Sequence, residues 1–248
     1  MLRLLSYNIR FGGTGREGPL AEVIRAAEPD LVVFQEASDP AVIARLSKAT
    51  GLGVWGAQPR YSTGFMSRVP IAHYTWHHPP ETRHAFLEIV LGGDAGRVFG
   101  LHLSARFSKW SERQRRREIG LLLEGIREHQ KGFHVIVGDF NALAPGERLE
   151  AWRMPRWIQA LIWVSGRDIA RDTIQAMLDD GYVDAYRALH PDDAGHTFPT
   201  WGRHVRLDYL FTPAVFAPRV LSCEVGTGYE AAPAASDHYP LLSVLDVR

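Results

Sequence analysis

Apolar runs alternate with amphipathic segments along this chain and predict its architecture. Residues 2–9 ("LRLLSYNI") and 31–36 ("LVVFQE") are rich in strand formers, and the second run is almost continuously apolar, as in a strand covered on both faces. Residues 19–30 and 40–51 predict helices, because each has a proline near its start and a proline or glycine near its end. The N-terminal part therefore alternates strands with helices.

The remainder of the chain continues this alternation. Further strands are expected at residues 63–67, 84–91, 98–104, 134–140, 206–211, 219–225 and 240–247. A long helix is expected at about residues 111–130, where Ile119, Leu122, Leu123 and Ile126 form one apolar stripe. No repeat or linker divides these elements, so we expect a single domain over residues 1–248, an α/β or α+β layered sandwich.

Residues 144–180 differ in character from the rest of the chain. They contain three of the seven tryptophans, Trp152, Trp157 and Trp163, interspersed with arginines. Aromatic residues at helical spacing are usually core, so we interpret this region as a Trp-rich helical insertion packed on the sheets. The alternative is a lid or a wall over a substrate.

Composition narrows the functional classes. The chain has 28 basic and 28 acidic residues, so its overall charge does not indicate a nucleic acid, a membrane or an acidic partner. The single cysteine, Cys223, excludes an internal disulfide and a cysteine metal cluster. No apolar stretch approaches the roughly 18 residues that span a bilayer, and the N-terminus lacks a secretory apolar core. We therefore expect a soluble, cytoplasmic protein without a transmembrane segment.

Polar residues gather at the ends of the predicted strands. They are Asn8, Glu36, His102, Asp139, Asn141, Asp208, Asp237 and His238. A carboxylate in such a place needs a cation, a proton or hydrogen bonds, so each residue alone could be an ordinary strand end. Together they offer hard oxygen ligands suited to Mg²⁺ or Mn²⁺, and histidines that transfer protons near neutral pH. This combination indicates metal-assisted hydrolysis of a phosphate ester.

Six motifs connect the chain with a known group of enzymes. "SYNIR", "FQE", "LHLS", "GDFNA", "RLDYLF" and "SDHYPL" occur in the order and spacing of the endonuclease/exonuclease/phosphatase superfamily, which the chain resembles from about residue 4 to residue 245. That superfamily includes DNase I-like nucleases, apurinic endonucleases, sphingomyelinases and inositol polyphosphate phosphatases. The resemblance implies a four-layer α/β sandwich, with two mostly antiparallel sheets face to face, helices outside and an active site at one edge.

The resemblance also implies roles for the oxygen-bearing residues. Glu36 is expected to be the principal Mg²⁺ ligand, with Asn8 beside it. Asp237 is expected to be an additional ligand of the metal or of its water. Asp139 and Asn141 are expected to orient the attacking water and the phosphate.

Two histidines are expected to act on the phosphate. The resemblance implies that His238, held by Asp208, contacts the phosphate or acts as the base, and that His102 is a second phosphate-binding or acid/base histidine. Strand geometry supports the first pairing: neighbours in an extended chain point to opposite faces, so Asp237 is poorly placed to orient His238. The orienting acceptor must come from another strand, and Asp208 is the candidate.

One supporting residue is harder to place. DNase I-like members carry a carboxylate or tyrosine on the strand before the "HL" motif to support that histidine or the phosphate. Here Glu81 and Glu88 are the candidates, and neither matches clearly.

The substrate is indicated only by local features. Residues 106–117 carry six basic residues against one glutamate, so Arg106 and its neighbours could guide a polyanion, or form a solvated helix face. Trp201 or Phe198 could stack on a base or cover a lipid, although turn packing is equally compatible. Because the basic signal is confined, we favour a phosphodiesterase acting on a small molecule or lipid head group over a DNA or RNA nuclease. A non-catalytic binding module is the lesser alternative.

Overall fold

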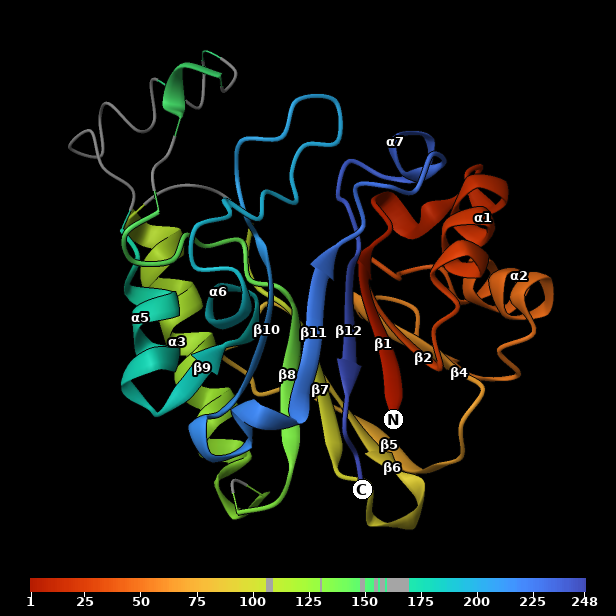
Figure 1. Cartoon of the computed structure of the whole chain (residues 1–248), viewed down its shortest axis with the longest axis horizontal. Coiled ribbons are helices and arrows are strands. Elements are labelled where there is room, and N and C mark those ends of the chain that lie inside the picture. The colour runs from red at the N-terminus through yellow and green to blue at the C-terminus, as the bar shows by residue number, and fades with distance from the viewer. Residues whose placement is uncertain (106–108, 130, 148–149, 154–155, 157–158, 160–169) are drawn as a thin grey trace.

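The structure, a computed structural model, describes all residues except 106–108, 130, 148–149, 154–155, 157–158 and 160–169 (Figure 1). The described residues form two six-stranded sheets that pack face to face, with helices on their outer sides. This is the four-layer α/β sandwich that the sequence predicts. No helix of the described residues is long and apolar enough to cross a membrane.

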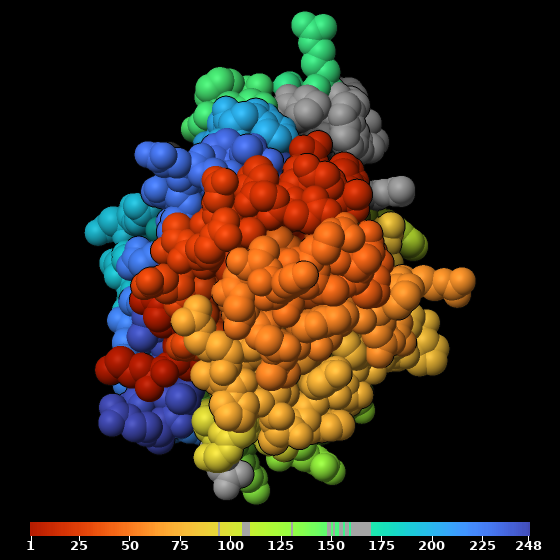
Figure 2. All heavy atoms as spheres, turned by 90° about the vertical axis from the view of Figure 1, so that its right-hand side faces the viewer, coloured from red at the N-terminus to blue at the C-terminus, as the bar shows by residue number. Residues whose placement is uncertain are grey.

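The first sheet lies toward the N-terminal helices. Its strands, in spatial order, are β11 (Val220–Val225), β12 (Leu241–Leu245), β1 (Leu2–Asn8), β2 (Leu31–Gln35), β4 (Thr63–Ser67) and β3 (Val54–Ala57). The helices on its outer side are α1 (Glu17–Ala27), α2 (Pro40–Thr50) and the short α7 (Ala232–Ala235). Figure 2 looks onto this side, which the red and orange N-terminal segment fills. Ile24, Ile43 and Phe34 are among the fully buried residues of that layer.

The second sheet carries the remaining strands. They are, in spatial order, β5 (Ile71–His77), β6 (Phe86–Leu91), β7 (Arg97–His102), β8 (His134–Asp139), β10 (Asp208–Pro213) and β9 (Tyr182–Asp184). The helices α3 (Lys109–Gly125), α5 (Asp172–Asp179) and α6 (Ala185–Leu189) lie against it. Ile119 of α3 and Ile174 of α5 pack with Phe99 and Ile136 of the sheet. Short 3₁₀ helices lie at Phe11–Gly13, Gly92–Asp94, Arg127–His129, Ala151–Arg153 and Ala214–Arg219.

Strand register brings the polar strand ends to one edge of the sandwich. All strand pairs are antiparallel except β1 with β2 and β7 with β8. Asn8 pairs with Gln35, and Asp139 pairs with both His102 and Asp208. The carboxyl ends of β1 and β2 lie at the same edge of the first sheet, and those of β7 and β8 at the same edge of the second. The hydrogen bond from Asn8 to Asp139 shows that these two edges meet. The buried Val33 and Val137, from different sheets, belong to the core that holds the two sheets together.

Three strands have no clear signal in the sequence. β3 contains Gly56 and only four residues, and β9 has only three. β5 is partly exposed along its length and rich in histidine, so its apolar period is weak. The expected helix at 111–130 is present as α3, which ends at Gly125 and is followed by the 3₁₀ turn at Arg127–His129.

The expected Trp-rich insertion at 144–180 lies largely outside the described residues, including Trp157 and Trp163. Its described parts include the 3₁₀ turn at Ala151–Arg153 and α5. Trp152 in that turn is 75% exposed, so this tryptophan is not core. The expectation of a helical pair over the whole segment stays a prediction.

Candidate active site

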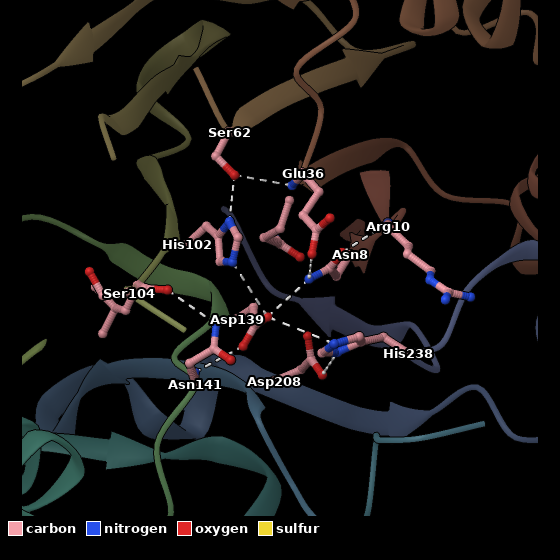
Figure 3. Close-up of polar contacts among 12 residues, drawn as sticks. Asn8, Arg10, Glu36, Ser62, His102, Ser104, Asp139, Asn141, Asp208 and His238 are labelled. Atoms are coloured by element: carbon pink, nitrogen blue, oxygen red, sulfur yellow. Dashed lines mark hydrogen bonds and ion pairs between the residues drawn. The ribbon is translucent and has the colours of Figure 1, made fainter. Parts of the chain in front are cut away.

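Asp139 stands at the centre of the polar cluster (Figure 3). It ends β8, is 1% exposed, and receives a hydrogen bond of 2.9 Å on Oδ2 from Nδ2 of Asn8, which belongs to the other sheet. His102 Nε2 and His238 Nε2 lie 3.8 and 3.9 Å from the same oxygen. Its other oxygen accepts the backbone N–H of Asn141 at 2.9 Å. The buried Asp139 carboxylate therefore connects the two sheets and lies close to both predicted histidines.

His238 is oriented by a residue from another strand. Its Nδ1 donates to Asp208 Oδ2 at 2.9 Å, so the structure places Asp208 beside this imidazole, as strand geometry predicts. The loop that carries His238 is fixed to β1 through Ser236, whose hydroxyl donates to the Asn8 carbonyl at 2.6 Å and accepts the His238 N–H at 3.2 Å. With Nδ1 committed, Nε2 is the nitrogen that faces the pocket.

Burial and neighbouring charges shift the pKa values of both His238 and Asp139. Burial opposes the positive charge of His238, but Asp208, together with Asp139 and Asp237, outweighs it and raises the pKa of His238 to about 10. Burial raises the pKa of Asp139 to about 7; the Asp208 carboxylate adds to this effect and the His238 charge opposes it. Burial therefore disfavours the charged form of Asp139, and a cation beside the carboxylate would offset that cost.

Glu36 leaves β2 in an unusual conformation. Its φ of 58° lies in the left-handed region, and its carboxylate accepts hydrogen bonds from the Phe11 N–H at 2.5 Å and from Asn8 Nδ2 at 3.4 Å. Among the described non-glycine residues with positive φ, Phe11, Arg60 and Asn141 also line the same pocket. Strained backbone of this kind persists only where surrounding structure enforces it, and it concentrates at functional sites.

The oxygen-rich cluster fits a hard divalent cation. Asp208 Oδ1 is buried without a hydrogen-bond partner among the described residues, and burial raises the pKa of Asp139. The described residues contain no ready-made group of three or more His, Cys, Asp or Glu side chains around one point. However, Mg²⁺ commonly uses only one or two carboxylates and keeps several waters, so the expectation of a metal at Glu36 does not require such a group.

Two expected ligands have other partners in this arrangement. Asn8 directs its Nδ2 to Glu36 and Asp139, and its Oδ1 accepts the Arg10 N–H at 3.0 Å. The amide therefore holds the two carboxylates together. Asp237 forms an ion pair with Arg10 Nε at 3.3 Å, so a guanidinium lies beside the carboxylate for which we expect a metal.

His102 is supported by residues that sequence reasoning does not identify. Its Nδ1 contacts the Ser62 hydroxyl, and its ring stacks on His84 with centroids 4.8 Å apart and planes at 4°. Burial, followed by the positive charges of His84, His238 and Arg83, lowers the pKa of His102 well below its usual value. Burial therefore disfavours the protonated form of His102.

Neither carboxylate considered as support for His102 has that role in the described part of the chain. Glu88 binds His77 at 2.8 Å and Arg97 at 3.0 Å, whereas Glu81 lies 3.6 Å from Arg117. Ser62 gives no signal in the sequence because a serine before a strand is common. The only sequence hint of His84 is its position immediately before an apolar run.

A pocket of about 560 Å³ opens over this cluster. Its lining includes Glu36, Asp139 and His238, together with the aromatic rings of Phe11 and Phe198. The Phe198 ring lies 4.8 Å from that of His238 (centroid to centroid). This volume is that of a typical small-ligand site.

Of the two expected substrate-binding residues, Trp201 lies outside the lining of the pocket and Arg106 is not among the described residues. Trp201 is 70% exposed and its ring lies 6.3 Å from that of Phe198, outside the lining of the pocket. Arg106 falls outside the described residues. Within the basic run that follows it, Arg115 is fully buried and paired with Glu112 at 2.7 Å, so part of this run serves the packing of α3.

Comparison with known proteins agrees with this site and fold. Residues 5–238 match the Endonuclease/Exonuclease/phosphatase family, and the chain belongs to that family. No curated protein sequence gives a significant match.

Solved structures share the fold over nearly the whole chain. One is a variant of the 3' phosphatase NExo from Neisseria bound to a product DNA hairpin, with 19% identity and a TM-score of 0.74. Others are an AP endonuclease from Archaeoglobus fulgidus (19%, 0.75) and the 3'-5' exonuclease NExo from Neisseria meningitidis (18%, 0.71). Each match covers 99% of this chain and 100% of the other. At these identities the likeness establishes the fold.

Proposed function

We propose that the protein is a divalent-metal-dependent phosphoesterase that hydrolyses phosphodiester bonds by attack of water. The observation that carries this proposal is the buried grouping of His238, Asp208 and Asp139, with Asn8 and Glu36 beside it, against one pocket. Carboxylates that can hold a cation lie next to imidazoles that face the pocket, and both can stabilise the charge that develops in metal-assisted phosphoryl transfer. Membership of the family supports the same class of reaction.

We assign the cation to the oxygen side of the cluster. Glu36 is the principal ligand, Asn8 lies beside it, and Asp237 is an additional ligand of the metal or its water. When bound, Mg²⁺ or Mn²⁺ supplies positive charge to the phosphoryl oxygens and lowers the pKa of a bound water.

The remaining residues position water and phosphate. Asp139, held by Asn8, accepts the proton of the attacking water, and Asn141 beside it orients the phosphate. His238, held by Asp208, donates Nε2–H to a phosphoryl oxygen as an imidazolium. The neutral His102 is a second donor on the other side of Asp139.

The pocket favours a compact substrate. Phe11, Tyr61 and Phe198 give it apolar walls, while Arg60 and Arg83 add positive charge to its lining. An apolar or ring-shaped group next to a phosphodiester, as in a small molecule or a lipid head group, matches this lining. The chain also lacks the net positive charge that is typical of proteins that bind long nucleic acids.

A DNA or RNA nuclease is the second candidate. One fold neighbour was solved bound to a product DNA hairpin, and α3 of this chain exposes Arg113, Arg116 and Arg117. A nuclease predicts cleavage of a polymer with steep salt dependence, because each neutralised phosphate releases counterions. A compact-substrate enzyme predicts weak salt dependence.

The test is hydrolysis of bis-p-nitrophenyl phosphate by the purified full chain in Mg²⁺ or Mn²⁺, compared with EDTA. We expect turnover only with metal, and a loss of about 10²–10⁴-fold in His238→Ala. His73→Ala changes an exposed histidine of β5 outside the pocket and serves as the matched control. Turnover that persists in EDTA, or that His238→Ala leaves unchanged, contradicts the proposal. Parallel reactions with sphingomyelin, cyclic nucleotides, RNA, and single-stranded and duplex DNA then identify the substrate class.

A further inference from the structure

Ser62 lies directly before β4 and contacts two functional residues at once. Its hydroxyl oxygen accepts the Glu36 backbone N–H at 3.3 Å and also contacts Nδ1 of His102 (Figure 3). The residue is 7% exposed, and its carbonyl accepts the Ala37 N–H at 2.9 Å. The hydroxyl is therefore held in place between the predicted metal ligand and the second histidine.

Hydrogen-bond accounting at this hydroxyl selects one form of the imidazole. A serine hydroxyl has one proton to donate and two lone pairs to accept. The described residues place no third partner at Ser62 Oγ. If Nδ1 of His102 carried a proton, Nδ1 would donate to the hydroxyl, and the hydroxyl proton would have no acceptor among the described residues. If Nδ1 is unprotonated, the hydroxyl donates to it and every group is satisfied.

The proton of the neutral ring then resides on Nε2, which faces the catalytic cluster. This nitrogen lies 3.8 Å from Asp139 Oδ2. The parallel stack with His84 fixes the plane of the ring, and the lowered pKa of His102 agrees with a neutral imidazole. His102 accordingly presents an N–H group, and not a lone pair, to the pocket.

We propose that Ser62 is a positioning residue that fixes His102 as the Nε2–H tautomer, so that His102 donates a hydrogen bond to a phosphoryl oxygen and does not act as a base. The second half of this statement rests on the proposed function, whereas the tautomer does not. The two histidines then differ through their partners: Asp208 can only accept from His238, and Ser62 donates to His102.

The tautomer can be read directly by ¹H–¹⁵N two-bond correlation spectra of the full chain labelled at its histidines, without substrate. His102→Gln assigns the signals among the 11 histidines. We expect the Nε2–H pattern in the wild type and in Ser62→Thr, and loss of that preference in Ser62→Ala. Ser38→Ala removes another pocket-lining hydroxyl and should leave the pattern unchanged. An Nδ1–H pattern in the wild type overturns the proposal even if no variant folds.

Kinetics separate an effect through His102 from an effect through Glu36. Ser62→Ala should lower kcat/KM for bis-p-nitrophenyl phosphate about fivefold to tenfold, the equivalent of one ordinary hydrogen bond, and Ser62→Thr should restore it. In a His102→Gln background, Ser62→Ala should have no further effect. A full additional loss in that background would mean that Ser62 acts through Glu36, and it would overturn the assignment. If the wild type hydrolyses no phosphodiester, the proposed function fails while the spectra still decide the tautomer.

Discussion

Nδ1 of His238 donates a hydrogen bond of 2.9 Å to Oδ2 of Asp208, although the two residues are 30 positions apart in the sequence. Both side chains are buried. The adjacent residue Asp237 pairs with Arg10 at 3.3 Å. The Asp-His dipeptide at the end of the chain is thus divided between two partners, and this division leads to separate predictions for its two members.

Replacing Asp208 should impair the function of His238 while the imidazole itself stays in the site. Asp208→Asn deletes the charge that holds the raised pKa of His238, so that pKa falls. In the wild type the Asp208 carboxylate raises the pKa of His238 to about 10; the variant should lose activity at lower pH, with a fall of about 10²-fold or more in kcat at neutral pH. The pH dependence of kcat/KM for bis-p-nitrophenyl phosphate measures this shift. An alkaline limb identical to that of the wild type would contradict the orienting role of Asp208.

Asp237 and Arg10 should change metal dependence in opposite directions. Asp237→Asn removes the negative charge of this expected ligand and should raise the Mg²⁺ concentration required for half-maximal activity. Arg10→Gln releases the Asp237 carboxylate from its ion pair and should lower that concentration. Titration of Mg²⁺ against the initial rate measures both changes. If Asp208→Asn and Asp237→Asn gave the same metal profile, the division of roles between these aspartates would be wrong.

Asp139 should lower the stability of the folded protein at neutral and alkaline pH, although it contributes to hydrolysis. Its pKa is raised from the ordinary 3.8 to about 7, so the folded state retains a proton that the unfolded state loses. Its favourable contribution is complete below pH 3.8 and disappears as the pH rises through 7. Metal-free Asp139→Asn should therefore melt a few degrees above the wild type at about pH 8, with a smaller difference at about pH 5, while hydrolysis falls about 10²–10⁴-fold. Thermal unfolding in EDTA at both pH values tests this; a variant less stable than the wild type at the higher pH would show that Asp139 is not penalised by burial.

Trp201 should contribute to substrate binding and not to the chemical step. It is 70% exposed and lies beside Phe198, which contacts the His238 ring. Removing a contact that is equal in the ground and transition states raises KM and leaves kcat unchanged. We expect Trp201→Ala to raise KM about fivefold to tenfold for a substrate with a large apolar or ring-shaped group, with little change for a small dialkyl phosphate. Exposed Trp110 on α3 offers a control substitution. An equal effect on both substrates would indicate a role in the fold.

The architecture is readable from the sequence where its physical signal is strong. The near-continuous apolar run at 31–36 and the helix bounded by Pro40 and Gly51 predict elements close to those in the structure. β3 and β9 are too short to show a period, and β5 is too polar. The expected cytoplasmic location stays a prediction.

The sequence predicts which types of residue form the site, but it does not predict which of them contact one another. Asp139 and Glu36 stand out because a carboxylate after an apolar strand needs a partner. Ser62 has no such signature, because its role depends on strand packing that brings β4 beside the end of β7. The Arg10–Asp237 ion pair likewise depends on two loops that meet in space, so residue spacing alone suggests only a metal ligand.

The most direct measurement is a double-mutant cycle of His238→Ala and Asp208→Asn on the Mg²⁺-dependent kcat/KM for bis-p-nitrophenyl phosphate. If Asp208 acts through His238, the double variant should be no slower than His238→Ala alone, because residues that work as a unit are strongly non-additive. Multiplied losses would show that the two residues act separately. Wild-type turnover that does not require a metal, or that survives both substitutions, would contradict the account as a whole.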